Sequence, residues 1–124
     1  MENTFEKIGA SFTNTYFNMF DTSRESVGQF YLPNAMLTFE GDQVQGPEAI
    51  VAKFKSLTFQ KVQHVITTTD TQPTTEGGVI ILVVGQLKTD DDPPNAFIRT
   101  FCLKPVNGSF AVFHDIFRLG LHNL

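Results

Sequence analysis

Asn107-Gly108 is the strongest turn signal in this chain, because both residues tolerate the positive φ angles that a two-residue hairpin loop requires. The segments on either side, residues 97–106 and 109–117, are therefore expected to pair as antiparallel strands, with Val106 opposite Ser109. This register predicts Cys102 opposite Phe113 and Ile98 opposite Phe117 on one face, with Phe101 opposite His114 and Leu103 opposite Val112 on the other. Both faces then carry apolar groups, so both need a cover.

The first third of the chain has the apolar spacing of a helix. Asn3 is the expected N-cap, with Glu6 as its reciprocal partner, and residues 21–23 are expected to end the helix and cap a short second one through Val27 and Phe30. The first helix carries a single apolar stripe, made of Phe5, Ile8, Phe12, Tyr16, Met19 and Phe20.

The remaining elements complete an α+β chain. A third helix opens with Pro47 at its first position, and strands are expected over residues 35–40, 61–70 and 79–87. Three short helices can cover one face of a curved sheet. A second copy of the chain is the economical cover for the other face, so we expect a homodimer.

Three consecutive aspartates, Asp90-Asp91-Asp92, follow the strand 79–87, which has no ionisable side chain, and run into Pro93-Pro94. The prolines cannot donate to a sheet, so strand pairing should stop there and leave the carboxylates at an exposed rim. This arrangement suits the docking of a basic partner better than proton transfer. A solubilising hairpin tip is the simpler alternative.

Composition narrows the possible functions of this chain of 124 residues. A net charge of −4 without a Lys/Arg cluster disfavours nucleic-acid binding, and no apolar stretch has the length of a membrane span. The single cysteine, the absence of a signal-peptide pattern and the lack of metal-ligand spacing among His64, His114 and His122 indicate a reducing compartment and no metal or cofactor. The 13 phenylalanines exceed what a small core needs and indicate a cavity or an interface.

Two positions are candidates for chemistry or binding. His64 is expected to face inward from a strand, where Tyr16 and Asp115 could reach the same cavity, although a half-buried structural histidine and a strand salt bridge of Asp115 are the commoner explanations. Glu40 follows Phe39 at the end of a strand and precedes a turn. It presents a charge beside an apolar pocket, or else is a surface residue flanking the turn.

Several segments, in order and with matching spacing, resemble the nuclear transport factor 2 family over nearly the whole chain. They are Leu37-Thr38-Phe39-Glu40-Gly41 with Gln45-Gly46, Phe59-Gln60-Lys61-Val62-Gln63-His64, Val83-Val84-Gly85-Gln86-Leu87, Asp90-Asp91-Asp92-Pro93, and Phe117-Arg118-Leu119 with Leu121-His122-Asn123. The resemblance implies one domain over residues 1–124, with a strongly bent antiparallel sheet wrapped around three helices as a cone, and a homodimer formed across the outer sheet.

The resemblance also implies a function. Members bind the small GTPase Ran in its GDP form and carry it through nuclear pores, so the chain is expected in the cytoplasm, at the pore and in the nucleus. An aromatic side chain of Ran would enter the cavity, and its basic residues would pair with acids at the rim. The implied rim acids are Glu40, Asp90 and Asp92; the implied cavity lining is Phe39, Leu57, Val62, Leu87, Thr89, Ile116 and Phe117.

The resemblance assigns Phe5 to the phenylalanine-glycine repeats of nucleoporins, on a surface separate from the Ran site. Phe5 and Phe39 stand where animal relatives commonly have Trp. An enzyme on the same cone fold, an isomerase or dehydratase using His64 in the cavity, is the main alternative to a transport adaptor. A third alternative is an accessory domain that dimerises without binding Ran, which the presence of Glu40 with the three aspartates argues against.

Overall fold

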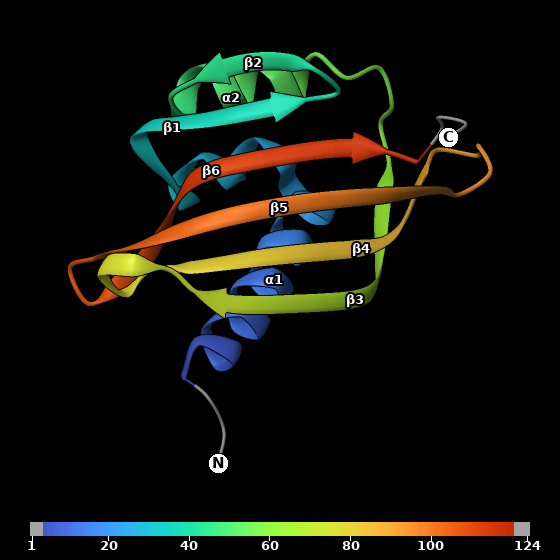
Figure 1. Cartoon of the computed structure of the whole chain (residues 1–124). Coiled ribbons are helices and arrows are strands. Elements are labelled where there is room, and N and C mark those ends of the chain that lie inside the picture. The colour runs from blue at the N-terminus through green and yellow to red at the C-terminus, as the bar shows by residue number, and fades with distance from the viewer. Residues whose placement is uncertain (1–3, 121–124) are drawn as a thin grey trace.

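The computed structural model describes residues 4–120, in which one curved sheet partly encloses the helices (Figure 1). The helices are α1 (Thr4–Ser23), the 3-10 helix η1 (Arg24–Phe30), α2 (Pro47–Lys55) and the short 3-10 helix η2 (Thr75–Gly77). The strands are β1 (Tyr31–Phe39), β2 (Asp42–Gln45), β3 (Val62–Pro73), β4 (Val79–Thr89), β5 (Asn95–Val106) and β6 (Ser109–Leu119). Asn3, the predicted N-cap, lies outside the described residues.

The sheet has the strand order β2-β1-β6-β5-β4-β3 and is mixed. Strands joined by a hairpin pair antiparallel, but β1 and β6 pair in parallel, so the prediction of a purely antiparallel sheet is wrong. A short hairpin loop forces antiparallel pairing, whereas β1 and β6 are separated by most of the chain, which leaves their relative direction free. The strand β2, which has 4 residues, was not predicted from the sequence.

Two α-helices form where three were expected. The second predicted helix is η1, a 3-10 helix of 7 residues that runs directly into β1. The predicted stripe of α1 packs on the core and is wider than expected, because Gly9, Thr13 and Phe17 are also buried. Gly9 lies against β3, where a Cβ atom would come within 2.6 Å of the Thr71 hydroxyl oxygen, so this close approach requires glycine.

The β5–β6 hairpin forms at Asn107-Gly108, with Val106 opposite Ser109 and Leu103 opposite Val112, as predicted. Beyond these pairs the register shifts by one residue at a β-bulge, so Cys102 faces His114 and Phe101 faces Asp115. The predicted pairs Cys102–Phe113, Phe101–His114 and Ile98–Phe117 are therefore wrong. A bulge sets two residues against one, which simple alternation from the turn cannot anticipate.

The inner face of the sheet and the helices share one core, rich in phenylalanine and tyrosine. The outer face remains apolar and uncovered in a single chain. Its large exposed side chains are Val65, Ile80, Leu82, Ile98 and Ile116, with exposed fractions from 38% to 57%. The prediction that both faces carry apolar groups is therefore confirmed.

Candidate functional site

A cavity of about 210 Å³ lies at the end of the sheet where β1, β4 and β6 finish and β3 and β5 begin. In Figure 1 this end carries the β4–β5 connection and the C-terminal end of β6. Six of the seven residues predicted to line the cavity do so, namely Phe39, Leu57, Val62, Leu87, Thr89 and Phe117. The sequence analysis did not name the other lining residues, Phe20, Phe59, Asn95, Arg99 and Leu119, as part of the cavity.

Aromatic rings form one wall of the cavity. Phe39 and Phe117 are register partners on β1 and β6, and their rings stack with centroids 4.6 Å apart and planes at 12°. The Phe54 ring packs edge to face against two other rings, with its centroid 6.3 Å from that of Phe39 and 5.0 Å from that of Phe20. Stacked and edge-to-face rings hold one another in place, so the wall is preorganised to receive an apolar group.

Ile116 does not line the cavity, contrary to the prediction. Its side chain is 50% exposed, whereas the neighbouring Phe117 is 3% exposed and belongs to the core. Successive side chains of a strand point to opposite faces, so Phe117 and Ile116 cannot both face inward. Ile116 belongs instead to the apolar outer face.

Glu40 follows β1 at the cavity rim and is held there by hydrogen bonds to β6. It follows β1 with a φ of 50°, its N–H donates to the Phe117 carbonyl over 3.1 Å, and its Oε1 accepts from the Leu119 N–H over 2.5 Å. Phe117 and Leu119 both line the cavity, which places this half-buried carboxylate at the cavity edge. The hydrogen bond fixes the carboxylate and leaves Oε2 for a partner.

The acidic tip, Asp90-Asp91-Asp92 between β4 and β5, contains three exposed aspartates, of which Asp90 is bonded to the backbone. The Asp90 carboxylate accepts the N–H groups of Gln60 (3.1 Å) and Lys61 (2.9 Å), so it ties the segment before β3 to the β4–β5 connection. Asp91 and Asp92 are exposed, and no hydrogen bond or ion pair of their carboxylates is found within residues 4–120. Asp92 is therefore open to a partner, whereas Asp90 has a structural role besides any contact with one.

His64 lies on β3 and faces inward, as predicted, with a side chain that is 3% exposed. Its Nδ1 lies 2.6 Å from Oδ1 of Asp21, and its backbone N–H donates to Oδ2 of Asp21 over 2.8 Å. Burial lowers the pKa of His64, and the nearby charge of Arg99 acts in the same direction, while the hydrogen bond and charge of Asp21 oppose them without reversing the shift. Asp21, rather than Tyr16 or Asp115, is its polar partner.

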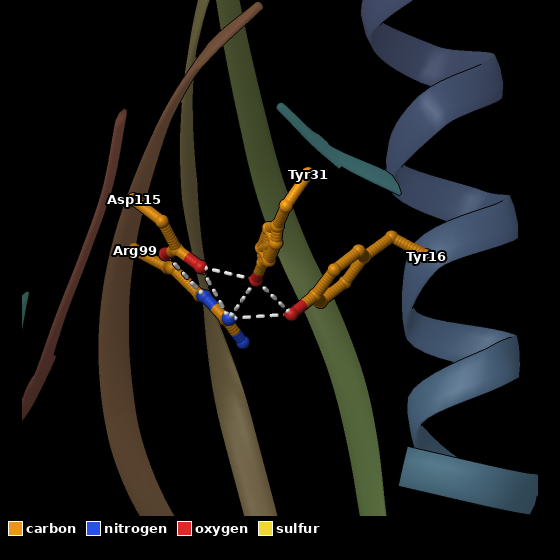
Figure 2. A network of polar contacts seen from close by, with 4 residues as sticks. All are labelled: Tyr16, Tyr31, Arg99 and Asp115. Atoms are coloured by element: carbon orange, nitrogen blue, oxygen red, sulfur yellow. Dashed lines mark hydrogen bonds and ion pairs between the residues drawn. The ribbon is translucent and has the colours of Figure 1, made fainter. Parts of the chain in front are cut away.

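Figure 2 shows a buried polar network that the sequence analysis did not assemble. Arg99 donates from Nε to Oδ1 of Asp115 (2.9 Å) and from Nη2 to Oδ2 of the same carboxylate (2.7 Å). Nη2 also reaches the hydroxyl of Tyr16 (2.7 Å), and the Tyr31 hydroxyl donates to Asp115 over 2.6 Å. The predicted strand salt bridge of Asp115 is thereby confirmed.

The network is held in its charged form by its own contacts. Burial is the largest single effect and acts to lower the pKa of Arg99, but the charge and hydrogen bond of Asp115 together with the two tyrosine hydroxyls outweigh it, and the pKa is raised well above its ordinary value. Burial raises the pKa of both tyrosine hydroxyls, so both stay protonated. Arg99 is the one residue by which the sequence could have indicated this network, because it is a charged residue at a position of β5 that alternates with buried Phe97 and Phe101.

Phe5 lies in the first turn of α1 and is not among the residues that line the cavity. It is half-buried and packs against the margin of the core. Part of its ring is thus available to a partner on a surface distinct from the cavity.

Residues 4–120 hold no group of three or more His, Cys, Asp or Glu side chains arranged to bind a metal ion. None of the helices described is both long and apolar enough to cross a membrane. His122 lies outside the described residues.

Comparison with known proteins gives a consistent family assignment. The model of the nuclear transport factor 2 domain matches residues 8–119. Nuclear transport factor 2 of Saccharomyces cerevisiae is 46% identical over 117 residues, which cover 93% of this chain and 94% of the yeast protein. The chain belongs to the nuclear transport factor 2 family.

Other members of the nuclear transport factor 2 family agree with this assignment in sequence and in structure. The probable nuclear transport factor 2 of Caenorhabditis elegans is 40% identical over 126 residues, covering 96% of this chain and 95% of the worm protein. The structure of nuclear transport factor 2 from Cryptosporidium parvum superimposes with a TM-score of 0.91 at 43% identity, covering 97% of this chain and 98% of that one.

Membership of the nuclear transport factor 2 family decides between the main alternatives. The chain has a role in nuclear transport, as a carrier rather than an enzyme, and it acts in the cytoplasm and the nucleus. The predicted cone fold is confirmed apart from its helix count and its one parallel pair of strands. His64, whose ring is held by Asp21, is accordingly a residue of the cavity wall and not a catalytic base.

Proposed function

We propose that the chain binds the GDP form of Ran and carries it through nuclear pores. The observation that carries this proposal is the cavity with stacked aromatic walls, bordered by the fixed Glu40 carboxylate and the exposed Asp92. An aromatic side chain of Ran fills the cavity, and basic residues around that side chain meet the acidic rim. Such pairing of an apolar anchor with complementary charges gives both affinity and orientation.

Titration of the carrier with Ran-GDP and Ran-GTP tests this function. Binding of the GDP form alone supports the proposal, and it also excludes the alternative of an accessory domain that dimerises without binding Ran. The proposal assigns residues 1–124 to one domain, and it locates the chain at the pore as well as in the cytoplasm and the nucleus.

We propose further that the carrier is a homodimer formed across the outer face of the sheet. Val65, Ile80, Leu82, Ile98 and Ile116 are uncovered there in a single chain. A stable interface of this apolar kind buries roughly 1,200 Å² or more in total. The partner for such a surface is most simply a second copy, because a symmetric dimer presents the same patch twice.

The first prediction concerns assembly. We expect analytical ultracentrifugation at micromolar concentration to show a dimer of the 13.9 kDa chain, and Ile98→Glu to show a folded monomer. The substitution places a charge at a side chain that is 49% exposed in one chain and would be buried between two. Thr75→Glu, on the exposed η2 turn, is the matched control and should remain dimeric. A wild-type monomer would contradict this assembly.

The second prediction concerns Phe5, which we propose binds the phenylalanine-glycine repeats of nucleoporins. Phe5→Ala should weaken repeat binding about tenfold, the loss typical of truncating an aromatic anchor, and leave Ran-GDP affinity unchanged. Immobilised repeat peptide and Ran-GDP are titrated with the same preparations, and circular dichroism monitors the fold. Equal loss of both affinities, or unfolding, would show instead that Phe5 is a core anchor for α1.

A further inference from the structure

Within residues 4–120, one nitrogen of the buried Arg99 has no hydrogen-bond partner. Nε and Nη2 make all of its hydrogen bonds to residues 4–120, and in Figure 2 the remaining terminal nitrogen, Nη1, has no contact with the other three residues drawn. Among residues 4–120, Thr13 Oγ1 is the only fully buried side-chain polar atom without a hydrogen-bond partner. Nη1 also lacks a partner, so it is not fully buried and keeps some accessible surface. Since Arg99 is 1% exposed and lines the cavity, we infer that this surface of Nη1 is turned toward the cavity.

The charge of Arg99 is already balanced by Asp115, which accepts two of its hydrogen bonds at 2.9 and 2.7 Å. Nη1 therefore offers a hydrogen-bond donor without an unpaired positive charge. The rim of the cavity carries Glu40 and the acidic tip, and the chain has a net charge of −4. An anionic ligand would meet this negative field, so a neutral ligand with an oxygen acceptor suits the cavity better.

His64 supplies the complementary acceptor. A carboxylate only accepts hydrogen bonds, so the 2.6 Å contact with Asp21 requires the proton of the imidazole to lie on Nδ1. Burial lowers the pKa of His64, so the ring is neutral at physiological pH and Nε2 keeps its lone pair. No partner of Nε2 is found within the described chain, and His64 lines the same cavity as Arg99.

Apart from Thr89 and Asn95, the remaining cavity wall is apolar and aromatic, with the ring centroids of Phe39 and Phe117 stacked at 4.6 Å. Its volume of about 210 Å³ corresponds to about seven water molecules at liquid density, which is the space of one substituted benzene ring. We propose that this cavity binds a small neutral phenol, whose oxygen accepts a hydrogen bond from Arg99 Nη1 and whose hydroxyl donates to His64 Nε2. The inference does not depend on Ran.

A ligand series tests the proposal on the wild-type dimer without any partner. Phenol, anisole, toluene and benzoate are titrated into ¹⁵N-labelled protein, and the shifts of cavity residues are followed by NMR. Phenol should bind about tenfold more tightly than toluene, which has the same shape without the oxygen, because two hydrogen bonds are gained. Anisole, which only accepts, should fall between them, and benzoate should be weaker than phenol. Equal affinity for phenol and toluene would overturn the proposal.

Substitution of His64 tests the assigned acceptor. His64→Phe retains a ring among Phe17, Phe20 and Phe97 but removes Nε2, so phenol should lose its advantage over anisole while toluene affinity is unchanged. Val62→Phe, which narrows the cavity without touching either polar group, should weaken all four ligands together. A phenol preference that persists in His64→Phe would contradict the role of His64.

The same series distinguishes a free phenol from a tyrosine side chain. N-acetyl-tyrosinamide is compared with N-acetyl-phenylalaninamide, which lacks only the hydroxyl. Tighter binding of the tyrosine compound would indicate that the cavity also accepts a phenol attached to a peptide backbone, whereas binding of phenol alone would restrict it to free small molecules. Absence of binding by any phenol at millimolar concentration would refute the inference, even if Ran-GDP binding is normal.

Discussion

Glu40→Lys is expected to weaken Ran-GDP binding by at least about 2–5 kcal/mol, the cost of removing one partner of a charge pair that is desolvated in a complex. The proposed pair lies beside a filled apolar cavity, and lysine would place like charges together. The substitution also removes the acceptor of the Leu119 N–H, which should reduce the free energy of unfolding by about 1 kcal/mol. The protein should remain folded and dimeric, because the core does not depend on this side chain.

Glu40→Gln is the matched control for charge. Its amide oxygen can still accept the Leu119 N–H, so stability should be close to wild type while Ran-GDP affinity still falls. Asp92→Asn, at the exposed tip, should have a smaller effect, about 1 kcal/mol or less, that diminishes as salt is raised. Calorimetric titration at two salt concentrations measures all three. Wild-type affinity in folded Glu40→Lys would mean that Glu40 is only a turn-flanking residue and that the Ran site lies elsewhere.

Arg99→Met is expected to lower the free energy of unfolding by about 3–5 kcal/mol, the typical effect of breaking a buried ion pair by removing one partner. Asp115 would be left 0% exposed without its two hydrogen bonds from Arg99. A loss of this size is a large fraction of the roughly 5–15 kcal/mol that stabilises a small domain. Urea unfolding at fixed protein concentration measures it, since a dimer's stability depends on concentration.

Two further variants separate the ion pair from general packing. Lys55→Met removes a positive charge from an exposed position of α2, away from the outer face of the sheet, and should change stability by no more than about 0.5 kcal/mol. The double variant Arg99→Met/Asp115→Leu removes both charges and leaves the Tyr16 and Tyr31 hydroxyls bonded to each other at 2.6 Å. It should regain much of the lost stability. A single variant as stable as wild type would show that the network contributes little to the fold.

The family resemblance, rather than local sequence rules, supplied the expected cavity lining, and six of its seven residues line the cavity. Strand alternation and turn chemistry placed Phe39 and Glu40 at the end of β1, and two prolines left Asp92 exposed. Ile116 was misplaced because its assignment came from the family resemblance, although alternation with Phe117 already placed it on the opposite face.

Three features could not be predicted from the sequence: a bulge, a buried polar network and a parallel strand pair. The register of β5 and β6 changed at a single bulge, which no local residue pattern announces. Arg99 finds its partners on α1, β1 and β6, so its role emerges only when Tyr16, Tyr31 and Asp115 are brought together. The parallel pairing of β1 with β6 is likewise a consequence of tertiary assembly.

The central claim is that this carrier recognises Ran in its GDP form through the aromatic cavity and its acidic rim. Calorimetric titration of the wild-type protein with Ran-GDP, and in parallel with Ran-GTP, tests it most directly. The account predicts saturable binding of one Ran-GDP per chain and no measurable binding of Ran-GTP at the same concentrations. Equal binding of both forms, or binding of neither by a folded dimer, would contradict it.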